Sequence, residues 1–415
     1  MASVGGSNLA GIAQYNERLV LQLIRRAHSL TKADIARITH LSAQTASVII
    51  NRLLAEKLLC KQKPRHEVGK VGQPAIPISL NPAGAYSLGV KIGRRGLDAV
   101  LINFTGEILR RCAYDYAYAD PDFIFPTIRR AIRELTQDFS PAQAKRLLGI
   151  GVAAPYGLGG WQHEAGIPTP ITARWNSIDI KQTIQADQTL PVWLVNDATA
   201  ACIASMALDN SQKFNNYLYI FVGTFIGGGI VMNSTLYSGS FNNAGAIGSM
   251  PLPNRYAAEP LDKRTPVQLI NCASRYLLNQ RFQSLGLQPD DMLTGLANHR
   301  TEPPFDQAKV CFDQWLNQAA PAIAHAIAAA VSVIDFEGVI IDGSFPPELT
   351  QQLTHAVSDS MQPLDLEGLT LPRIVAGTMG NDARVVGGAF LTFYTNFTPD
   401  RNILISSAQN VSHAF

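Results

Sequence analysis

Five polar side chains between residues 42 and 52 have the types and the spacing for hydrogen bonds to nucleic acid. Ser42, Gln44, Thr45 and Ser47 would stand on the first turns of a helix, and Arg52 would follow further along it. Hydroxyl and amide groups at the start of such a helix can bond base edges or phosphates, whereas an arginine further along is better placed for a phosphate. The segment therefore predicts a DNA-reading helix.

A basic loop follows this helix. The stretch 58–63 predicts a strand, 64–74 a turn and 76–80 a second strand, which together make a β-wing. Around its tip the loop carries Lys63, Arg65, His66 and Lys70. Because cationic side chains neutralise phosphates, we expect Lys63, Arg65 and Lys70 to bind DNA.

Three helices must position these side chains. Residues 15–27 have apolar side chains at helical spacing, which predicts one buried stripe. Thr31, with Asp34 three residues later, predicts the N-cap of a short second helix, and Ser42 predicts the N-cap of a third. Two helices joined by a tight turn present the second one to a major groove. A small helical dimerisation domain with solvated lysines is the alternative.

The charge is divided unevenly along the chain. Residues 1–80 hold eleven Lys and Arg against four Asp and Glu, a net of +7, and the rest holds 23 against 28, a net of −5. This asymmetry predicts contact with nucleic acid at one end only. With 415 residues, 47% of them hydrophobic and 16% charged, the chain should form a well-packed protein of two or three domains.

Neither membrane insertion nor secretion is expected from the sequence. The longest apolar stretches are too short to span a bilayer, and the first residues lack the basic and apolar regions of a signal peptide. The cysteines are scattered without a CxxC pair, which predicts a protein of the reducing cytoplasm that has no disulfide framework.

From residue 85 onward, short apolar runs alternate with helical patterns and predict an α/β body. The first half predicts three strands, a helix, a strand, a helix and a strand: 86–92, 97–104, 107–114, 121–135, 148–153, 178–185 and 192–196. The second half restarts with three strands and later has a fourth: 216–223, 227–233, 235–237 and 338–341. Two β-β-β-α-β-α halves facing a cleft are the architecture of the actin-like sugar kinases.

The N-terminal module resembles the winged helix of repressors in the ROK family, a name that combines repressors, open reading frames and kinases. The resemblance rests on residues 16–24 and 29–36. Members often carry a GRGRP wing that inserts arginine into the minor groove, and the matching stretch here is 69–74. Gln73 stands where an arginine is often found, so the resemblance implies a weaker minor-groove contact that depends on Lys70.

Five motifs of the body resemble the same family: 151–157, 195–201, 221–230, 335–344 and 380–389. They correspond to the GxxxPG strand end, the eNDanaaA segment, the second phosphate loop, an adenosine-side motif and the closing helix. The resemblance covers residues 12–395. It implies a winged helix-turn-helix followed by a two-lobed actin-like (ribonuclease H-like) sugar kinase fold. The expected domains are 1–82, the winged helix; 83–200 and 201–395, the two lobes; and 396–415, a tail.

The resemblance also implies residues for a ligand. In ROK kinases an aspartate takes the proton from the sugar hydroxyl, and Asp197, after the sugar-contacting position Asn196, stands at that place. A sugar in the cleft would be lined by Pro155, Tyr156, Trp175, Asn196 and Asp197. Two alternatives stay open: the Asn196–Asp197 pair caps a helix, and Trp175 is a core residue.

The phosphate chemistry departs from the family pattern. The first phosphate loop, DxGxT in kinases, has Lys91 in place of the metal-side carboxylate, so magnesium-bound ATP is not expected. Lys91, Arg94 and Arg95 could hold an anion, or they could be ordinary solvated or paired surface charges. Positions 227–229 resemble a glycine loop, which a tight strand connection also explains. The vestigial phosphate and nucleotide positions are Lys91, Gly93, Arg94, Gly223, Thr224, Gly227, Gly228 and Gly343.

The zinc chemistry of the family is missing as well. Its GEIGH segment supplies a glutamate to the sugar and a histidine to zinc, and here Ala246 and Ser249 stand at those positions. The cysteine-rich loop that should follow is absent, and Cys272 alone is not a zinc site. We therefore expect no cofactor. Hydrophobic packing through Leu252, Tyr256 and a helix over 267–278 should take the place of the zinc.

These features predict a transcriptional regulator, most simply a repressor of carbohydrate-use genes, whose kinase-like body is not catalytic. The body would sense a sugar or sugar derivative. It would also form a homodimer or higher oligomer that places two helices on a palindromic operator in double-stranded DNA. Two other functions stay open: an active ATP-dependent ROK sugar kinase, and a regulator whose body binds a protein.

Overall fold

The computed structural model describes residues 9–64, 75–155, 157–158, 168–209, 214–256 and 266–400. The chain divides into two compact units, Met1–Val195 with Gly388–Phe415 and Asn196–Gly387. The described strands of each unit include a five-stranded sheet. The first unit also carries the N-terminal module.

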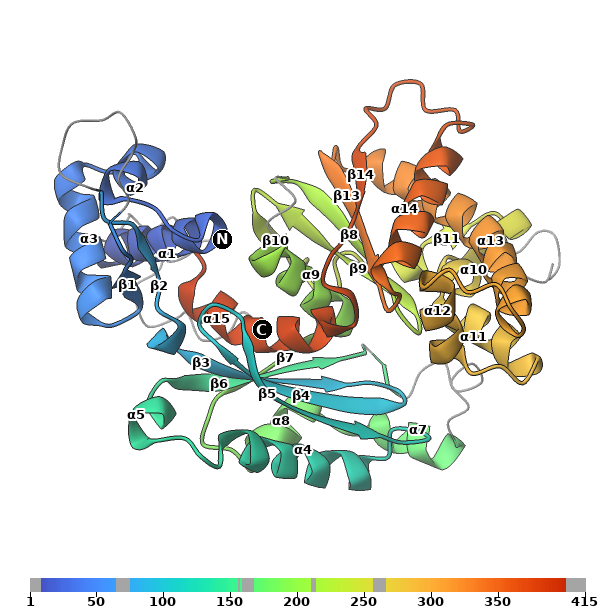
Figure 1. Cartoon of the computed structure of the whole chain (residues 1–415), viewed down its shortest axis with the longest axis horizontal. Coiled ribbons are helices and arrows are strands. Elements are labelled where there is room, and N and C mark those ends of the chain that lie inside the picture. The colour runs from blue at the N-terminus through green and yellow to red at the C-terminus, as the bar shows by residue number, and fades with distance from the viewer. Residues whose placement is uncertain are drawn as a thin grey trace, which may run out of the picture. The chain divides into compact units, whose positions relative to one another are not determined.

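In the described residues before 81, three helices and a short antiparallel sheet form the N-terminal module (Figure 1). The elements are α1 (Leu9–Ala27), α2 (Lys32–Thr39), α3 (Ala43–Ala55), β1 (Leu59–Lys61) and β2 (Ile78–Leu80). Apolar side chains from all three helices fill the core, among them Val20, Ile24, Ile35, Ile50 and Leu53. The predicted helices and wing strands are therefore present.

Both predicted helix caps are confirmed. The hydroxyl of Thr31 accepts a hydrogen bond from the backbone N–H of Asp34 at 3.1 Å and donates one to the Asp34 carboxylate at 2.7 Å. The hydroxyl of Ser42 accepts from the backbone N–H of Thr45 at 3.0 Å. These caps fix where α2 and α3 begin, and so they fix the short turn between the two helices.

Helix α1 is longer than predicted, because it begins at Leu9 and not at 15. Gly11 lies within its first turns, where glycine lowers helix stability by about 0.5–1 kcal/mol relative to alanine. In the structure Gly11 is buried. The sequence pattern alone does not reveal that a residue this early in the helix is buried.

The sheet of the first unit has the strand order β5-β4-β3-β6-β7. Its strands are β3 (Tyr86–Ile92), β4 (Gly96–Asn103), β5 (Ile108–Asp115), β6 (Leu147–Ala154) and β7 (Val192–Asn196). Strands β3, β4 and β5 pair antiparallel, and β3 pairs parallel with β6. Helices α4 (Pro121–Thr136) and α8 (Ile180–Gln185) cover one face, and the second half of α15 (Ala383–Phe397) lies on the other (Figure 1).

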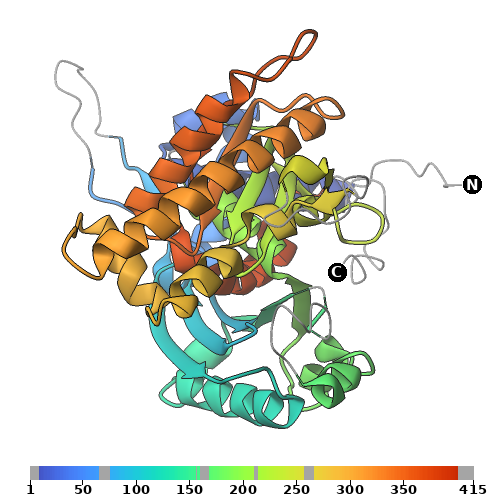
Figure 2. The same cartoon turned by 90° about the vertical axis from the view of Figure 1, so that its right-hand side faces the viewer.

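The sheet of the second unit has the order β10-β9-β8-β13-β14. Its strands are β8 (Tyr217–Val222), β9 (Ile226–Met232), β10 (Thr235–Tyr237), β13 (Gly338–Gly343) and β14 (Arg373–Ala376). The first three pair antiparallel, and β13 pairs parallel with β8 and β14. Helix α9 (Asp197–Leu208) covers one face, while α13 (Phe305–Val331) and α14 (Pro347–Met361) lie side by side on the other (Figures 1 and 2).

Shorter elements connect the strands. They are η1 (Pro82–Gly84), α5 (Pro141–Ala144), α7 (Thr169–Trp175), η2 (Ile247–Ser249), β11 (Pro251–Leu252), η3 (Asn254–Tyr256), β12 (Val267–Gln268), α10 (Ile270–Ala273), α11 (Arg275–Ser284), α12 (Pro289–Ala297) and η4 (Gly380–Asp382). The helix predicted over 267–278 is wrong, because Ser274 is extended (φ −72°, ψ 145°) and interrupts it. The Ser274 hydroxyl accepts from the backbone N–H of Ile226 at 3.1 Å, which holds that conformation.

The predicted β-β-β-α-β-α order is found in both units, but their borders differ from the expected ones. The break lies at Val195–Asn196 and not after 200, and the chain from Gly388 onward belongs to the first unit. The hydroxyl of Ser87 in β3 donates to the main-chain oxygen of Ala389 at 2.8 Å, which ties α15 to the first sheet. Across the described ranges, every helix is too short or too polar to cross a bilayer.

Candidate nucleic-acid interface and ligand-binding residues

The outward face of α3 carries the polar side chains that the sequence predicts for DNA. Ser42, Gln44 and Thr45 are exposed, and Ser47 is half-buried. The opposite face is buried against the module core through Ala46, Ile49, Ile50 and Leu53. Since those apolar residues fix the rotation of α3 about its axis, the polar set faces away from the core.

Two of these groups already serve the helix cap. The hydroxyls of Ser42 and Thr45 lie 2.8 Å apart, and Ser42 also accepts from the backbone N–H of Thr45. Gln44 takes no part in the cap and presents an amide, the group that best matches the major-groove edge of adenine. Gln44 is therefore the polar residue of this face with the clearest means of base readout.

Arg52 is exposed but paired within the module. Its Nη1 donates to Glu17 Oε1 at 2.8 Å and its Nε to Glu56 Oε1 at 3.0 Å. Burial raises the pKa of Glu17, and Arg52 acts against that rise. A phosphate would have to compete with two carboxylates for Arg52, which the sequence did not indicate.

The wing is described only at its base. Lys63 is exposed two residues after β1 ends. Arg65, Lys70 and Gln73 lie outside the described residues. Sequence reasoning missed Lys32, whose ammonium donates to the side-chain oxygen of Asn51 at 2.9 Å and joins α2 to α3.

In the body, Asn196 and Asp197 begin helix α9. The Asn196 side-chain oxygen accepts from the backbone N–H of Ala198 at 2.9 Å, so Asn196 is an N-cap, as one of the two alternatives held. Asp197 Oδ2 lies 3.7 Å from Arg384 Nη1, and its side chain is 24% exposed. Arg384, which the sequence did not single out, also donates to the Ser344 hydroxyl at 3.1 Å. Because Asn196 makes the cap, the Asp197 carboxylate takes no part in it and stays partly exposed.

The cations of the first phosphate motif are engaged in the structure. Lys91 Nζ lies 2.8 Å from Asp98 Oδ2, and both side chains are mostly buried. Arg94 is buried and donates to the main-chain oxygen of Gly157 at 3.2 Å. Gly93 closes a tight turn, in which its N–H bonds the oxygen of Gly96 at 2.9 Å. For Lys91, the ion-pair alternative is the one that the structure supports.

The glycines of the second phosphate motif have a packing explanation. Gly227 and Gly228 lie in strand β9, not in a loop, opposite Phe221 and Ile220 of β8. A Cβ on Gly227 would come within 2.8 Å of the Ala198 side chain, and a Cβ on Gly228 would overlap the backbone of β8. The loop interpretation of 227–229 is therefore wrong.

Gly223 and Thr224 do form the turn between β8 and β9, and Gly343 ends β13. The main-chain oxygens of Gly223 and Thr224 accept from the backbone N–H groups of Arg275 and Tyr276, both at 3.1 Å. A Cβ on Gly343 would approach the oxygen of Val222 to 2.6 Å. The turn thus holds the start of α11, and Gly343 allows β13 and β8 to lie close.

The aromatic residue expected to line the ligand is in a core. Trp175 is 5% exposed, and its indole N–H donates to the main-chain oxygen of Ala119 at 2.7 Å. Its ring also contacts Phe125. These contacts agree with the core alternative, and a sugar platform would require Trp175 to leave them. Pro155 directly follows β6, and Tyr156 lies outside the described residues.

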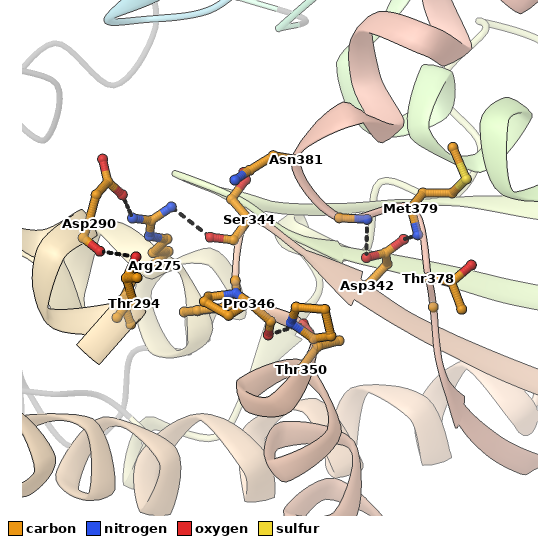
Figure 3. A pocket seen from close by; sticks show the side chains of 15 residues that line it. Arg275, Asp290, Thr294, Asp342, Ser344, Pro346, Thr350, Thr378, Met379 and Asn381 are labelled. Atoms are coloured by element: carbon orange, nitrogen blue, oxygen red, sulfur yellow. Dashed lines mark hydrogen bonds and ion pairs between the residues drawn. The ribbon is translucent and has the colours of Figure 1, made fainter. Parts of the chain in front are cut away.

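A cavity of about 360 Å³ lies within the second unit, among α11, α12, α14 and the ends of β13 and β14 (Figure 3). On one side Arg275 pairs with Asp290 and donates to the main-chain oxygen of Ser344 at 2.7 Å. The hydroxyl of Thr350 and the amide of Asn381 are among the other polar groups of the wall. The wall of the cavity is thus a mixture of polar and apolar groups, in which Arg275 and Asp290 form an ion pair.

Asp342 occupies the opposite end of this cavity (Figure 3). Its carboxylate accepts from the backbone N–H groups of Gly343, Gly380 and Met379 at 2.8, 3.1 and 3.2 Å, and from the hydroxyl of Tyr219 at 3.1 Å. Burial raises the pKa of Asp342, although these four hydrogen bonds act in the opposite direction. Backbone N–H groups that could receive a phosphate are therefore used by a carboxylate of the chain itself.

Comparison with known sequences decides the family. A sequence profile described as the ROK family matches residues 87–394, well over half of the chain. The chain belongs to the ROK family.

Relatives within the ROK family include both repressors and kinases. The xylose repressor of Bacillus subtilis (strain 168) is 24% identical over 245 residues, which is 58% of this chain and 61% of that protein. The match therefore spans only about three-fifths of the length of that repressor. An N-acetylmannosamine kinase of Haemophilus influenzae (strain ATCC 51907 / DSM 11121 / KW20 / Rd) is 29% identical over 211 residues, 51% of this chain and 66% of the kinase.

Solved ROK structures share the fold. A ROK family transcriptional regulator, homologous to the MLC protein of E. coli, superposes with a TM-score of 0.63 at 18% identity, over 96% of this chain and 100% of that one. A ROK family glucokinase from Streptomyces griseus superposes with a TM-score of 0.53 at 20% identity, over 74% of this chain and 99% of the glucokinase. The fold class expected from the sequence is confirmed.

The residues present do not fit the zinc of ROK proteins. Cys272 lies in α10, its thiol donates to the oxygen of Gln268 at 3.5 Å, and burial raises its pKa to about 11. Zinc binds the thiolate, so this raised pKa disfavours it. In the part of the chain that the structure describes, no three His, Cys, Asp or Glu side chains gather into a metal site.

The residues do not fit magnesium-bound ATP in the manner of a ROK kinase either. Lys91 replaces the metal-side carboxylate and is paired with Asp98. Asp342 holds the backbone N–H groups beside the cavity of the second unit. We therefore derive no phosphoryl-transfer step from this site.

Proposed function

We propose that this ROK protein is a sequence-specific DNA-binding transcriptional regulator, a repressor of carbohydrate-use genes whose body senses a sugar or sugar derivative. The observation that carries the proposal is α3, which is capped by Ser42, buried along one face and polar along the other. The similarity to a xylose repressor over part of the chain supports it. Such a regulator would act in the cytoplasm, in keeping with five cysteines that are all free thiols.

The proposed DNA complex is that of a homodimer on a palindromic operator. A second copy related by a two-fold axis presents a second α3 to the next turn of the groove, and the spacing of half-sites follows from the dimer. Lys63 and Arg65 would bind the phosphate backbone, and Lys70, with Gln73, would contact the minor groove. Arg52 joins them where a phosphate displaces Glu17 and Glu56.

The proposed effector contacts Asn196 and Asp197. A carboxylate accepts hydrogen bonds from sugar hydroxyls, and an amide both donates and accepts. Asp197 retains an exposed fraction of 24% beside Arg384, which suits a polyhydroxylated ligand. The sugar alters DNA affinity only to the extent that it binds the DNA-bound and free states differently.

A selection experiment tests the DNA part. Wild-type protein is incubated with a pool of duplexes that have a random core, and bound duplexes are sequenced and measured by gel shift. Gln44→Ala and Thr45→Ala should change the selected sequence. Lys63→Ala and Arg65→Ala should weaken binding to all duplexes alike. They should also reduce the slope of log affinity against log salt concentration by about 1 for each phosphate that is no longer neutralised. Lys145→Ala, an exposed lysine outside the module, is the matched control, and a wild-type protein that retains no duplex at low salt contradicts the proposal.

A panel of pentoses, hexoses and their phosphates tests the effector part. One sugar should raise the unfolding temperature and release the selected duplex, and Asp197→Asn should abolish both effects. A protein that binds DNA and responds to no sugar would favour a protein effector instead.

The retained Asn196–Asp197 pair is the observation that favours a second function, a ROK sugar kinase. The same panel with magnesium and ATP distinguishes the two functions. We expect no ADP above the background of Asp197→Asn. ADP formation that depends on Asp197 would show that the body is catalytic.

A further inference from the structure

A valine lies in the middle of the polar face of α3. Val48 is 63% exposed, whereas its neighbours Ile49 and Ile50 are 6% and 0% exposed. Helical spacing places Val48 one turn after Gln44 and one turn before Arg52 on the outward face. The centre of the surface proposed to read DNA is therefore apolar.

The fold gives no reason for a valine at this position. A β-branched residue is a weaker helix former than lysine, glutamate or alanine, and an exposed apolar side chain contributes little to stability because little of its surface is buried. The polar residues one turn further along the helix are already engaged: Asn51 accepts from Lys32 at 2.9 Å, and Arg52 pairs with Glu17 and Glu56. Val48 is thus the central outward side chain that can meet a base edge without breaking an interaction within the module.

The chemistry of the major groove matches an apolar group here. Thymine is the base that presents a methyl group in that groove, and apolar side chains recognise it by contact. Valine holds two methyl groups in one preferred rotamer on a helix, so it can make this contact at little entropic cost. Gln44, one turn away, has the amide that matches adenine.

We infer that Val48 is a specificity-determining residue that reads the methyl group of a thymine at the centre of each half-site. This inference rests on the proposed function, because it requires α3 to lie in the major groove. It adds a prediction that the polar residues do not make: each half-site contains one thymine whose methyl group contributes to binding.

The test removes the methyl group from the DNA and the methyl groups from the protein. The best duplex selected by the wild-type protein is synthesised again with deoxyuridine in place of thymidine, one position at a time. The wild-type protein should bind one of these duplexes about fourfold more weakly, the loss expected for about one buried methyl group. Val48→Ser should bind the thymidine duplex about fourfold more weakly and should no longer distinguish thymidine from deoxyuridine at that position.

A matched variant controls for the loss of an exposed valine. Val310 in α13 is 55% exposed, so Val310→Ser makes the same change outside the N-terminal module. It should keep both the affinity and the deoxyuridine effect of the wild type. Because both valines are exposed, neither variant should unfold.

The possible outcomes separate this inference from the proposed function. A wild-type protein that selects a duplex but is indifferent to deoxyuridine at every position overturns the role of Val48 and leaves DNA binding intact. A Val48→Ser variant that still binds the deoxyuridine duplex more weakly than the thymidine duplex likewise overturns the role of Val48 and leaves DNA binding intact. If Val48→Ser alters only the oligomeric state, measured by light scattering, then Val48 is a protein contact and the inference is wrong. A wild-type protein that selects no duplex overturns the proposed function itself.

Discussion

Arg25 of α1 donates a hydrogen bond from Nη1 to the main-chain oxygen of Phe104 at 2.8 Å. Its guanidinium also lies over the rings of Phe104, Phe390 and Phe393, at 5.0, 5.2 and 5.8 Å from their centroids. Phe104 follows β4 of the first sheet, and the other two rings belong to α15. One side chain therefore joins the N-terminal module both to the sheet and to the helix through which the chain returns from the second unit.

Removal of Arg25 should destabilise the first unit. Arg25→Ala is expected to lower the free energy of unfolding by about 2–4 kcal/mol, because a buried carbonyl loses its donor and three rings lose a cation. Burial lowers the pKa of Arg25 to about 10, which leaves it charged at neutral pH. Arg25→Lys keeps the charge but lacks the planar guanidinium group, so its free energy of unfolding should lie between those of the wild type and Arg25→Ala.

Guanidinium unfolding measures the effect of these Arg25 variants. Arg133→Ala, which changes an exposed arginine of α4, is the control and should stay within about 0.5 kcal/mol of the wild type. Equal losses in Arg25→Ala and Arg133→Ala would show that the contact with the three rings contributes nothing.

The contact of α15 with β6 predicts a contrast between two glycines. A Cβ on Gly151 would overlap the main-chain oxygen of Gly388, whereas a Cβ on Gly388 would stay 3.2 Å from the oxygen of Gly151. Gly151→Ala should therefore cost at least about 3 kcal/mol, and Gly388→Ala should stay within about 1 kcal/mol because alanine favours the helix. Thermal unfolding of the two variants compares them directly, and similar losses would mean that the helix shifts freely.

Local signals made the N-terminal module predictable. A cap needs partners only three residues apart, so Thr31, Asp34 and Ser42 could be identified before any contact was known. The alternation of short apolar runs placed most strands of both sheets within one or two residues, and β3, β7 and β10 with the bounds observed. These features depend on neighbours in the chain, which is why the pattern contains them.

Long-range partners account for what the sequence missed. Arg52 pairs with Glu17, 35 residues away, and Trp175 bonds Ala119, 56 residues away. No spacing rule connects such positions. The glycines at 227 and 228 show a different limit. The same residues suit a phosphate loop and a strand that a helix or a neighbouring strand approaches closely, and packing alone distinguishes the two.

Asp98 should make stability depend on pH at the acidic end. Burial by itself raises the pKa of Asp98, but Lys91 at 2.8 Å and Arg111 at 3.3 Å outweigh it, so the pKa lies below its usual value. A carboxyl whose pKa is lowered on folding stabilises the protein above its unfolded pKa of about 3.9, and the stabilisation is lost as the pH falls through the folded value. Asp98→Asn should therefore cost about 1–3 kcal/mol at pH 7 and progressively less below about pH 4.

Urea unfolding of wild type and Asp98→Asn at neutral and acidic pH measures this difference. Asp138→Asn is the control, since Asp138 pairs with Arg110 at the surface with 66% of its side chain exposed, and it should cost less than about 1 kcal/mol. A loss in Asp98→Asn that is the same at every pH would indicate a shape effect and not the charge.

Asp342 should be coupled to Tyr219 across the core of the second unit. The carboxylate accepts four hydrogen bonds, and asparagine would turn an N–H₂ group toward some of those donors, so Asp342→Asn should cost about 2–4 kcal/mol. Tyr219→Phe removes one donor and leaves three, so about 1 kcal/mol is expected. Because the hydroxyl and the carboxylate are 3.1 Å apart, the double variant should lose less than the sum of the two, by the coupling of about 0.5–3 kcal/mol that is typical of residues in contact. Chemical unfolding of the two single variants and the double variant gives this coupling, and strictly additive losses would show that Tyr219 and Asp342 act independently.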